Sequence, residues 1–462
     1  MPRYVRSQLL LFCTLVACDP ALQLITSTRN DAESGSDTAL PRNPRLNWIQ
    51  GYPGVHPLSV ATPLDGDLIV VGHFSDSVYF GATELVSAGG EDIFVAAFAP
   101  SGAPRWAQRF GGIGDDRANG VAVDSQGNIT FTGQFSATVD FGVFSLTSMG
   151  AYDLFVARIN FYGVSWARAM GGSGDDRGYA VALSPFGVLV TGRLYGPLSF
   201  GETELSETGA TLLFYNGVGH QQWARRVVSP YDLFLQGLAV NAKGAIAVSG
   251  SFKDTISLGE TSLSSVGKDD GFLWQIAAQG ETLWGRSFSG PSAISAVDVA
   301  FAAEGTLWVA GHFSEIMTFG ATTLTSQEGR DLFVAQLDAV GDLVQLRSFV
   351  GAGLYNHIID IAVDGQGGAI IGGGFNDQIH FDSHQLIAKT TSDMFVTRLD
   401  DEEQTLWAEH LWSPGSHRLE NIAVSADSVY VVGEFRETLT VGETQLKGEV
   451  DSSMFIVSLG LL

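Results

Sequence analysis

A repeat of about 60 residues is the feature that most constrains how this chain can fold. A Gly-x-Phe triplet recurs along the chain, and neighbouring copies lie 58 to 62 residues apart. The triplets begin at Gly72, Gly133, Gly250, Gly311, Gly373 and Gly433, and Gly192 begins the divergent copy Gly-Arg-Leu. Self-similarity at a fixed period indicates a repeat architecture. The chain therefore contains seven copies of one supersecondary unit.

The hydrophobic pattern of each unit predicts four short strands. In the second unit these are Val121–Val123, Ile129–Gly133, Asp153–Ile159 and Ser165–Arg168. The turn Asp124–Asn128 between the first two contains Gly and Asn, which accept the positive φ of a hairpin turn. Four antiparallel strands in each of seven units predict an all-β fold, a seven-bladed β-propeller.

The two ends of the repeat region predict how the ring closes. Internal units end in a strand that carries Trp, as at Trp106 and Trp166, but the last unit stops at Leu462 without one. A strand around Trp48 instead precedes the first unit. We expect this N-terminal strand, residues 45–51, to complete the last blade, so that residues 45–462 form one propeller with no open sheet edge.

The N-terminus predicts export. Residues 1–17 carry two arginines and a short apolar stretch, as in a secretory signal peptide. They end in Leu15-Val16-Ala17 before Cys18, which resembles a bacterial lipobox, and this resemblance implies a lipidated Cys18. An ordinary signal peptide is the alternative. We expect residues 18–44 to be a flexible tether and the protein to be a membrane-anchored lipoprotein that faces the periplasm or the cell surface.

Charge and composition narrow the function classes. With 50 acidic against 25 basic side chains, the net charge of −25 argues against a nucleic-acid partner, which needs a basic face. A hydrophobic content of 45% excludes disorder as the main state. We expect a folded monomer.

The repeat resembles the bacterial seven-bladed β-propeller repeat (SBBP) family. The resemblance rests on Trp106–Asp116, Val121–Gly133 and Asp153–Arg158, and it extends over about residues 46–462. It implies a propeller fold and an exported location, and the family has no common catalytic chemistry. A Gly four residues before Trp, as at Gly102 and Trp106, gives a weaker resemblance to quinoprotein-like propellers, which have eight blades. One of those is a lipoprotein subunit of an outer-membrane assembly machine.

Two glycine-rich acidic loops, 111–117 and 171–177, are weak candidates for metal binding. Asp115, Asp116, Asp175 and Asp176 supply the oxygen ligands that Ca²⁺ prefers, although the same carboxylates suit turn-capping hydrogen bonds and ion pairs. We expect no other cofactor. The chain has no Gly-x-Ser-x-Gly elbow, no His-Glu-x-x-His motif and no cysteine cluster.

One face of the ring is the predicted binding surface. Connections of about 18 residues between second and third strands, and of about ten between fourth and first strands, emerge on the same face, and loops on a rigid scaffold carry recognition. The candidate residues on this face are Tyr179, Tyr231, Asp232, Tyr355, Asn356, His357, His417 and Arg418.

These patterns predict a non-enzymatic binding or scaffold module for an envelope protein or a polysaccharide. The alternatives are an enzyme that acts on polysaccharide at the channel mouth, or a subunit of an outer-membrane assembly machine. Carboxylates or histidines that converge at the mouth from only a few blades would favour the enzyme, whereas a plain rim of turns would count against it.

Overall fold

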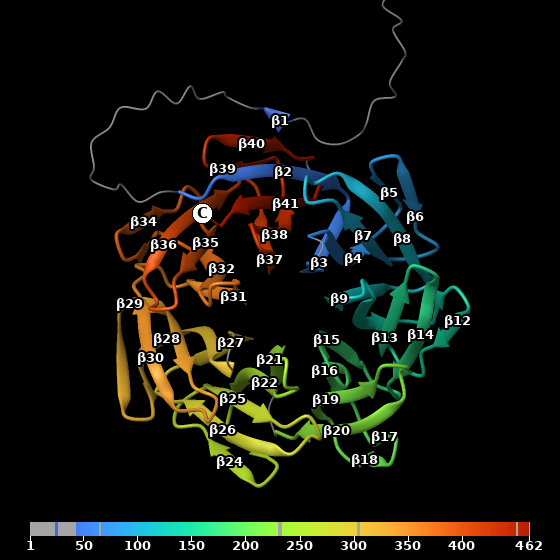
Figure 1. Cartoon of the computed structure of the whole chain (residues 1–462), viewed down its shortest axis with the longest axis horizontal. Helices are drawn as coiled ribbons and strands as arrows, with labels where there is room; N and C mark the ends of the chain where they lie inside the picture. Colours follow the sequence, from blue (N-terminus) through green and yellow to red (C-terminus); the bar gives the residue numbers. More distant parts are fainter. Residues whose placement is uncertain are drawn as a thin grey trace, which may run out of the picture.

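The computed structural model describes residues 24–25, 43–63, 66–229, 233–302, 305–449 and 451–461. Every named element in these ranges is a β-strand, and the strands form seven antiparallel blades arranged in a ring (Figure 1). Residues of all seven innermost strands line a central channel. None of the described segments is a helix long and apolar enough to cross a membrane. The predicted all-β, seven-bladed propeller is confirmed, and the count of seven differs from the eight blades of quinoprotein-like rings.

Each blade contains four strands, ordered from the channel outward. Blade 1 is β3 (Val55–Ala61), β4 (Leu68–Phe74), β7 (Asp92–Phe98) and β8 (Pro104–Gly112). Blade 2 is β9 (Asp116–Val123), β10 (Ile129–Phe135), β13 (Asp153–Asn160) and β14 (Gly163–Met170). Blade 3 is β15 (Arg177–Ser184), β16 (Gly187–Leu194), β19 (Gly209–Asn216) and β20 (Gln221–Val227). Blade 4 is β21 (Phe234–Val240), β22 (Ile246–Phe252), β25 (Asp270–Ile276) and β26 (Thr282–Phe288).

The remaining blades repeat this order. Blade 5 is β27 (Ile294–Phe301), β28 (Leu307–Phe319), β29 (Thr322–Leu337) and β30 (Leu343–Phe349). Blade 6 is β31 (His357–Val363), β32 (Ala369–Phe375), β35 (Asp393–Leu399) and β36 (Thr405–Trp412). Blade 7 is β37 (His417–Val424), β38 (Ser428–Phe435), β41 (Ser453–Gly460) and β2 (Leu46–Pro53).

The N-terminal strand closes the ring as predicted. β2 pairs with β41 from Leu46 opposite Leu459 to Pro53 opposite Ser453, and in Figure 1 the two strands lie side by side. The short β1 (Leu24–Ile25) pairs with β40 (Thr444–Lys447), so the segment predicted as a tether contains two residues of strand. The calls on residues 1–17 and on Cys18 lie outside the described residues.

The glycine of the Gly-x-Phe triplet allows the two innermost strands of a blade to approach closely. All seven innermost strands contain a register irregularity opposite this glycine. A Cβ at Gly72 would lie 2.0 Å from the carbonyl oxygen of His56, and one at Gly133 would lie 1.9 Å from that of Arg117. The following Phe74 and Phe135 are fully buried. In each triplet the glycine therefore permits the bulge, and the phenylalanine packs in the core.

The connections differ from prediction in one respect. The long connections contain the expected hairpins: β5 (Ser77–Phe80) with β6 (Thr83–Val86), β11 (Thr138–Phe141) with β12 (Phe144–Thr147), β17 (Leu198–Phe200) with β18 (Thr203–Leu205), β23 (Thr255–Leu258) with β24 (Thr261–Ser264), β33 (Gln378–Phe381) with β34 (His384–Ile387), and β39 (Thr438–Val441) with β40. β11 also pairs with β8, and β39 with β36, so these hairpins bind the preceding blade.

The prediction of about ten residues between fourth and first strands is wrong. Only residues 113–115 separate β8 from β9, because Gly111 and Gly112 belong to one strand and Asp116 to the next. Gly112 is required there, since a Cβ would lie 1.8 Å from the carbonyl oxygen of Thr138 in the paired hairpin.

Candidate functional site

The channel mouth is formed where the first residues of each innermost strand pair with the middle residue of the Gly-x-Phe triplet. These seven cross-strand pairs differ in every blade. They are His56 with His73, Arg117 with Gln134, Arg177 with Arg193, Phe234 with Ser251, Ser295 with His312, His357 with Gly374, and Arg418 with Glu434. The mouth therefore lacks the sevenfold symmetry of the scaffold, which suits it to recognise a ligand.

Blades 7 and 1 contribute a histidine–carboxylate network. His56 Nδ1 lies 3.0 Å from Glu434 Oε1, and Ser452 donates a hydrogen bond of 2.9 Å to Glu434 Oε2. The hydrogen bond to Glu434 raises the pKa of His56. The rings of His56 and His73 stack with centroids 4.9 Å apart, and burial lowers the pKa of His73 to about 3. One histidine of the stack is therefore poised to carry charge while the other stays neutral.

Two glutamates near Arg418 have pKa values shifted in opposite directions. Arg418 forms an ion pair with Glu420 and lies 3.9 Å from Glu434 Oε1. Burial raises the pKa of Glu420 to about 7. Burial would also raise the pKa of Glu434, but the hydrogen bond from His56 outweighs it and the pKa is lowered. At neutral pH one carboxyl is therefore ionised and the other is partly protonated.

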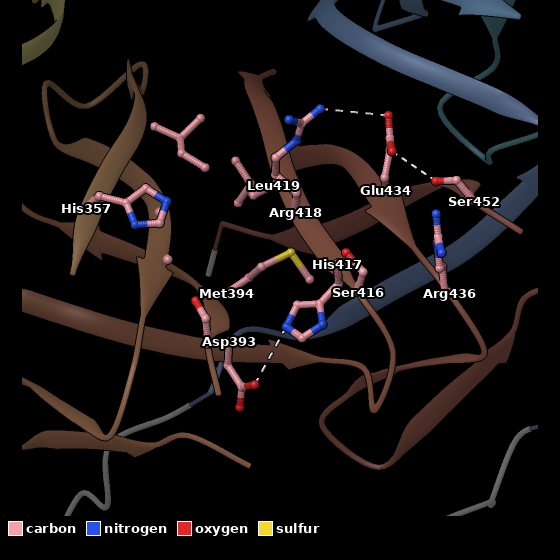
Figure 2. A pocket seen from close by; sticks show the side chains of 14 residues that line it. His357, Asp393, Met394, Ser416, His417, Arg418, Leu419, Glu434, Arg436 and Ser452 are labelled. Carbon is pink, nitrogen blue, oxygen red and sulfur yellow. Dashed lines mark hydrogen bonds and ion pairs between the residues drawn. The ribbon is translucent and has the colours of Figure 1, made fainter. Parts of the chain in front are cut away.

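A polar cavity of about 390 Å³ opens at the mouth between blades 6 and 7 (Figure 2). Its lining includes three serine hydroxyl groups and charged side chains from both blades: Ser392, Ser416, Ser452, His357, Asp393, His417, Arg418, Glu434 and Arg436. Figure 2 shows Arg436 beside Ser452, with His357 on the opposite wall. The guanidinium group of Arg436 forms no ion pair or side-chain hydrogen bond with a described residue, so it is available to a ligand.

Asp393 occupies a position whose carboxylate caps a turn in other blades. The matching carboxylates accept a backbone N–H from four residues earlier, at 3.1 Å for Asp153 and 3.0 Å for Asp270. Asp393 does the same and is also approached by His410 Nε2 at 2.7 Å and His417 Nε2 at 3.6 Å.

These two histidines reverse the direction of the carboxylate pKa shift at that position. Burial raises the pKa of Asp270. It would do the same for Asp393, but His410 and His417 hold the pKa of Asp393 well below its usual range. Burial alone would lower the pKa of His417, yet the contact with Asp393 raises it. The cavity wall therefore holds an imidazole whose protonated form is favoured by a fixed carboxylate.

Aromatic side chains line the opposite part of the mouth. The rings of Tyr179 and Phe234 lie 6.0 Å apart, and the guanidinium of Arg193 lies over the rings of Phe234 and Tyr195 at 5.7 and 5.0 Å. Phe234 is partly exposed. This part of the mouth offers stacking surfaces, whereas blades 6, 7 and 1 offer charged and polar groups.

The structure brings three of the predicted face residues together. His357, His417 and Arg418 line the cavity, and Tyr179 lies in the aromatic part of the mouth. Tyr355 is exposed on the loop before β31. Asn356, in contrast, is fully buried, and its amide donates to the carbonyl oxygens of Arg330 and Gly353, so it does not belong to the exposed face. Tyr231 and Asp232 lie outside the described residues.

The acidic loops use their carboxylates for local hydrogen bonds. Asp116 accepts the backbone N–H of Gly112 at 2.9 Å, and Asp176 accepts those of Gly172 at 2.9 Å and Tyr195 at 2.6 Å. Asp175 forms a two-bond ion pair with Arg177. Asp115 accepts the N–H of Glu91. Across the described part of the chain, no cluster of three His, Cys, Asp or Glu side chains is arranged to hold a metal ion. The calcium hypothesis remains an untested prediction.

Four residues of the mouth were not predicted from the sequence: His56, Glu420, Glu434 and Arg436. The available signal was the middle position of the Gly-x-Phe triplet, which differs in each unit and places His73 and Glu434 at the mouth. The mouth is thus not a plain rim of turns: histidines and carboxylates converge from blades 6, 7 and 1. Convergence of histidines and carboxylates from only a few blades is the arrangement that would favour the enzyme alternative.

The chain is a seven-bladed β-propeller whose mouth is polar and differs from blade to blade. No protein-family model and no curated protein matches the chain, so the SBBP resemblance stays an expectation. Among solved structures, the chain is similar to virginiamycin B lyase from Staphylococcus aureus (10% identity, 90% of this chain and 99% of that chain, TM-score 0.42). It is also similar to the Pan2 WD40 domain of Neurospora crassa (12%, 75% and 89%, 0.39) and a putative 6-phosphogluconolactonase from Bacteroides fragilis (11%, 86% and 86%, 0.39). At these scores the likenesses carry no inference about activity.

Proposed function

We propose that this protein is a binding module whose mouth cavity holds a saccharide unit of an envelope or extracellular polysaccharide. The observation that carries the proposal is the free guanidinium of Arg436 in a polar cavity rich in serine hydroxyls. Its volume of about 390 Å³ falls in the range of small-molecule sites, roughly 300–1,000 Å³. A concave polar cavity suits the hydroxyl groups of a sugar better than the flat surface of an envelope protein, and the aromatic part of the mouth can stack on further sugar rings.

Binding fits the site better than chemistry because its carboxylates are already engaged. Glu434 is held by His56 and Ser452, and Asp393 by His410 and the N–H of Lys389. Groups with fixed partners position a ligand well but have few free lone pairs for proton transfer. The unengaged group is a cation, which favours an acidic sugar over a neutral one.

Arg436→Ala tests the proposal. Titration with polygalacturonate, and with dextran as a neutral polymer, should show binding that this change weakens at least tenfold, with the larger loss for polygalacturonate. Lys243→Ala is the matched control, because Lys243 is an exposed cation in the β21–β22 turn at the other end of the channel. Equal behaviour of both variants, or binding of an envelope protein at the mouth with no polysaccharide binding, would contradict the proposal.

The lipid anchor on Cys18 is part of the same proposal. A lipidated cysteine would hold the propeller at a membrane where polysaccharide is exported or assembled. Fractionation of cells that express Cys18→Ala should move the protein from the membrane pellet to the soluble fraction. Unchanged membrane retention would count against the anchor.

Polysaccharide cleavage is the second candidate, and the opposite pKa shifts of Glu420 and Glu434 favour it. A protonated carboxyl beside an ionised one can donate a proton to a glycosidic oxygen while the other accepts one from water. If this is the activity, Glu420→Gln should abolish release of reducing ends from polygalacturonate while binding persists. Wild-type protein that binds the polymer and releases no ends over a long incubation would exclude cleavage of that substrate.

A further inference from the structure

The outermost strand of a blade packs its Trp on the turn between the third and fourth strands of the next blade. Trp166 donates its indole N–H to the carbonyl oxygen of Gly217 at 3.3 Å. Its ring lies against Gly219, where a Cβ would come within 2.6 Å. Arg168 Nε donates to the carbonyl oxygen of the same glycine at 2.9 Å. One glycine turn therefore accepts hydrogen bonds from the indole N–H and from the arginine, and it packs against the indole ring.

The same contact recurs at other blade boundaries. Trp223 donates to Ala278 O at 3.3 Å and Arg225 to Gly280 O at 2.6 Å. Trp48 donates to Pro100 O at 2.8 Å, and the ring of Trp284 lies against Gly341. The turns that cover these tryptophans are residues 99–103, 217–220, 277–281 and 338–342.

Blade 2 lacks such a turn. Only Phe161 and Tyr162 connect β13 to β14, so the preceding Trp106 is left 38% exposed, against 4% for Trp166. Neither the indole N–H of Trp106 nor the amide of Gln108, which takes the place of Arg168, forms a hydrogen bond with a described residue.

A groove of about 630 Å³ lies over these two side chains, and we call it the Trp106 groove. Its described lining carries no charge and consists of Trp106, Ala107, Gln108, Gln126, Gly127, Ile129, Ile159, Asn160, Phe161 and Gly163. Phe161, 96% exposed, stands at its rim.

We propose that the Trp106 groove is a docking site for a glycine-containing β-turn of another protein. The groove presents the same indole that binds such turns elsewhere in this ring, and the Gln108 amide is a second donor at the place of Arg168 and Arg225. Its neutral, donor-rich lining is complementary to an uncharged turn with two free carbonyl oxygens, and a glycine is needed for the turn to lie flat on the indole.

The proposed partner is a different protein, because the corresponding turns of a second copy already contact their own ring. One of them is residues 400–404, where Glu402 O accepts a hydrogen bond from Gln345. This site is separate from the proposed saccharide cavity because it lies at the opposite ends of the strands.

The probe is a backbone-cyclised peptide of residues 276–282 with the change Glu281→Gln, because this turn binds Trp223 in this protein and the change leaves it uncharged. Calorimetric titration into the full chain should show saturable binding, and Trp106→Ala should weaken it at least tenfold. A peptide in which alanine replaces the glycine equivalent to Gly280 should bind equally poorly. Phe186→Ala, which removes an exposed aromatic of blade 3, is the control and should leave binding unchanged.

A grafted variant keeps the test valid if Trp106→Ala fails to fold. Replacement of Phe161 and Tyr162 by a copy of residues 277–281 should let the chain cover its own Trp106, raise the melting temperature and abolish peptide binding. Absence of binding to the wild type overturns the proposal, as does binding that the graft leaves intact. Binding of cellohexaose that depends on Trp106, in place of the peptide, also overturns it, because the groove would then be a glycan site.

Discussion

At the scale of residues, one repeated position shows how neighbours set the behaviour of a buried carboxylate. Asp270 and Asp393 occupy equivalent places and cap the same turn. Burial raises the pKa of Asp270, so this group favours the folded state in its protonated form and loses that contribution as pH rises above about 3.9. The pKa of Asp393 is depressed, so it contributes above that pH and the contribution is lost as pH falls.

The two asparagine variants should therefore have opposite pH dependence. From pH 3 to pH 5 the melting temperature of the wild type should rise relative to Asp393→Asn and fall relative to Asp270→Asn. Thermal unfolding followed by circular dichroism at several pH values measures both differences. Parallel trends for the two variants would show that His410 and His417 do not control Asp393.

Residues at the mouth also show what a sequence can and cannot predict. His357, His417 and Arg418 were predicted because they differ between units at equivalent places. His56 and Glu434 were not, because they are 378 positions apart and meet only when the last blade closes on the first. Periodicity predicts that contact between the blades exists but not which side chains reach across it. Asn356 was misassigned because burial of a polar side chain in its own loop leaves no sequence signal.

At the scale of elements, β2 is the strand on which ring closure depends. It supplies the outer strand of blade 7, and Ile49 packs in the core shared by blades 6 and 7. Without β2, the edge of β41 and part of that core would be exposed. A chain that starts at Gly54 should therefore unfold at a lower temperature or aggregate, whereas one that starts at Asn43 should melt close to the full chain. Equal melting temperatures for the two would contradict closure by β2.

Strand counts were predictable and strand ends were not. The missing fourth strand of the last unit and the extra Trp48 strand before the first predicted β2 from counting alone. The segment around Gly111 and Gly112 reads as a loop because glycine is depleted in strands, yet it continues β8. Tertiary contacts require these glycines, since a Cβ at Gly112 would collide with the hairpin of the next blade and one at Gly111 with the side chain of Asp92.

At the scale of the whole molecule, side chains in the channel link blades 5, 6, 7 and 1 in series. Each linking residue follows the bulge of an innermost strand and accepts a backbone N–H from the next blade. Asp298 accepts from Ile361 at 3.2 Å, Asp360 from Ile422 at 2.6 Å, and Asn421 from Val60 at 2.9 Å. The last of these joins blade 7 to blade 1, the two blades that are also connected covalently where β2 runs into β3.

The contribution of Asp298 to these links depends on its protonation. Burial and the neighbouring Asp360 raise the pKa of Asp298. Asp298 therefore binds its proton more tightly in the folded state, and its stabilising contribution is lost as pH rises above about 3.9. Asp298→Asn is neutral at every pH, and its amide can donate to Asp360 as the protonated carboxyl does. The melting temperature of this variant should match the wild type near pH 4 and exceed it increasingly toward pH 8.

Asp360→Asn is the matched change on the other partner. Asp360 accepts hydrogen bonds from both Asn421 Nδ2 and the N–H of Ile422, each at 2.6 Å. Both donors bind the same oxygen, Oδ2. An asparagine oxygen can still accept both bonds but lacks the negative charge that strengthens them, so the change should cost about 1–3 kcal/mol. Calorimetry from pH 4 to pH 8 should find Asp360→Asn below the wild type and Asp298→Asn at or above it. A loss of stability in Asp298→Asn that grows with pH would show that this site holds a charge, and the ring of blades would then be joined at that boundary by an ion rather than a shared proton.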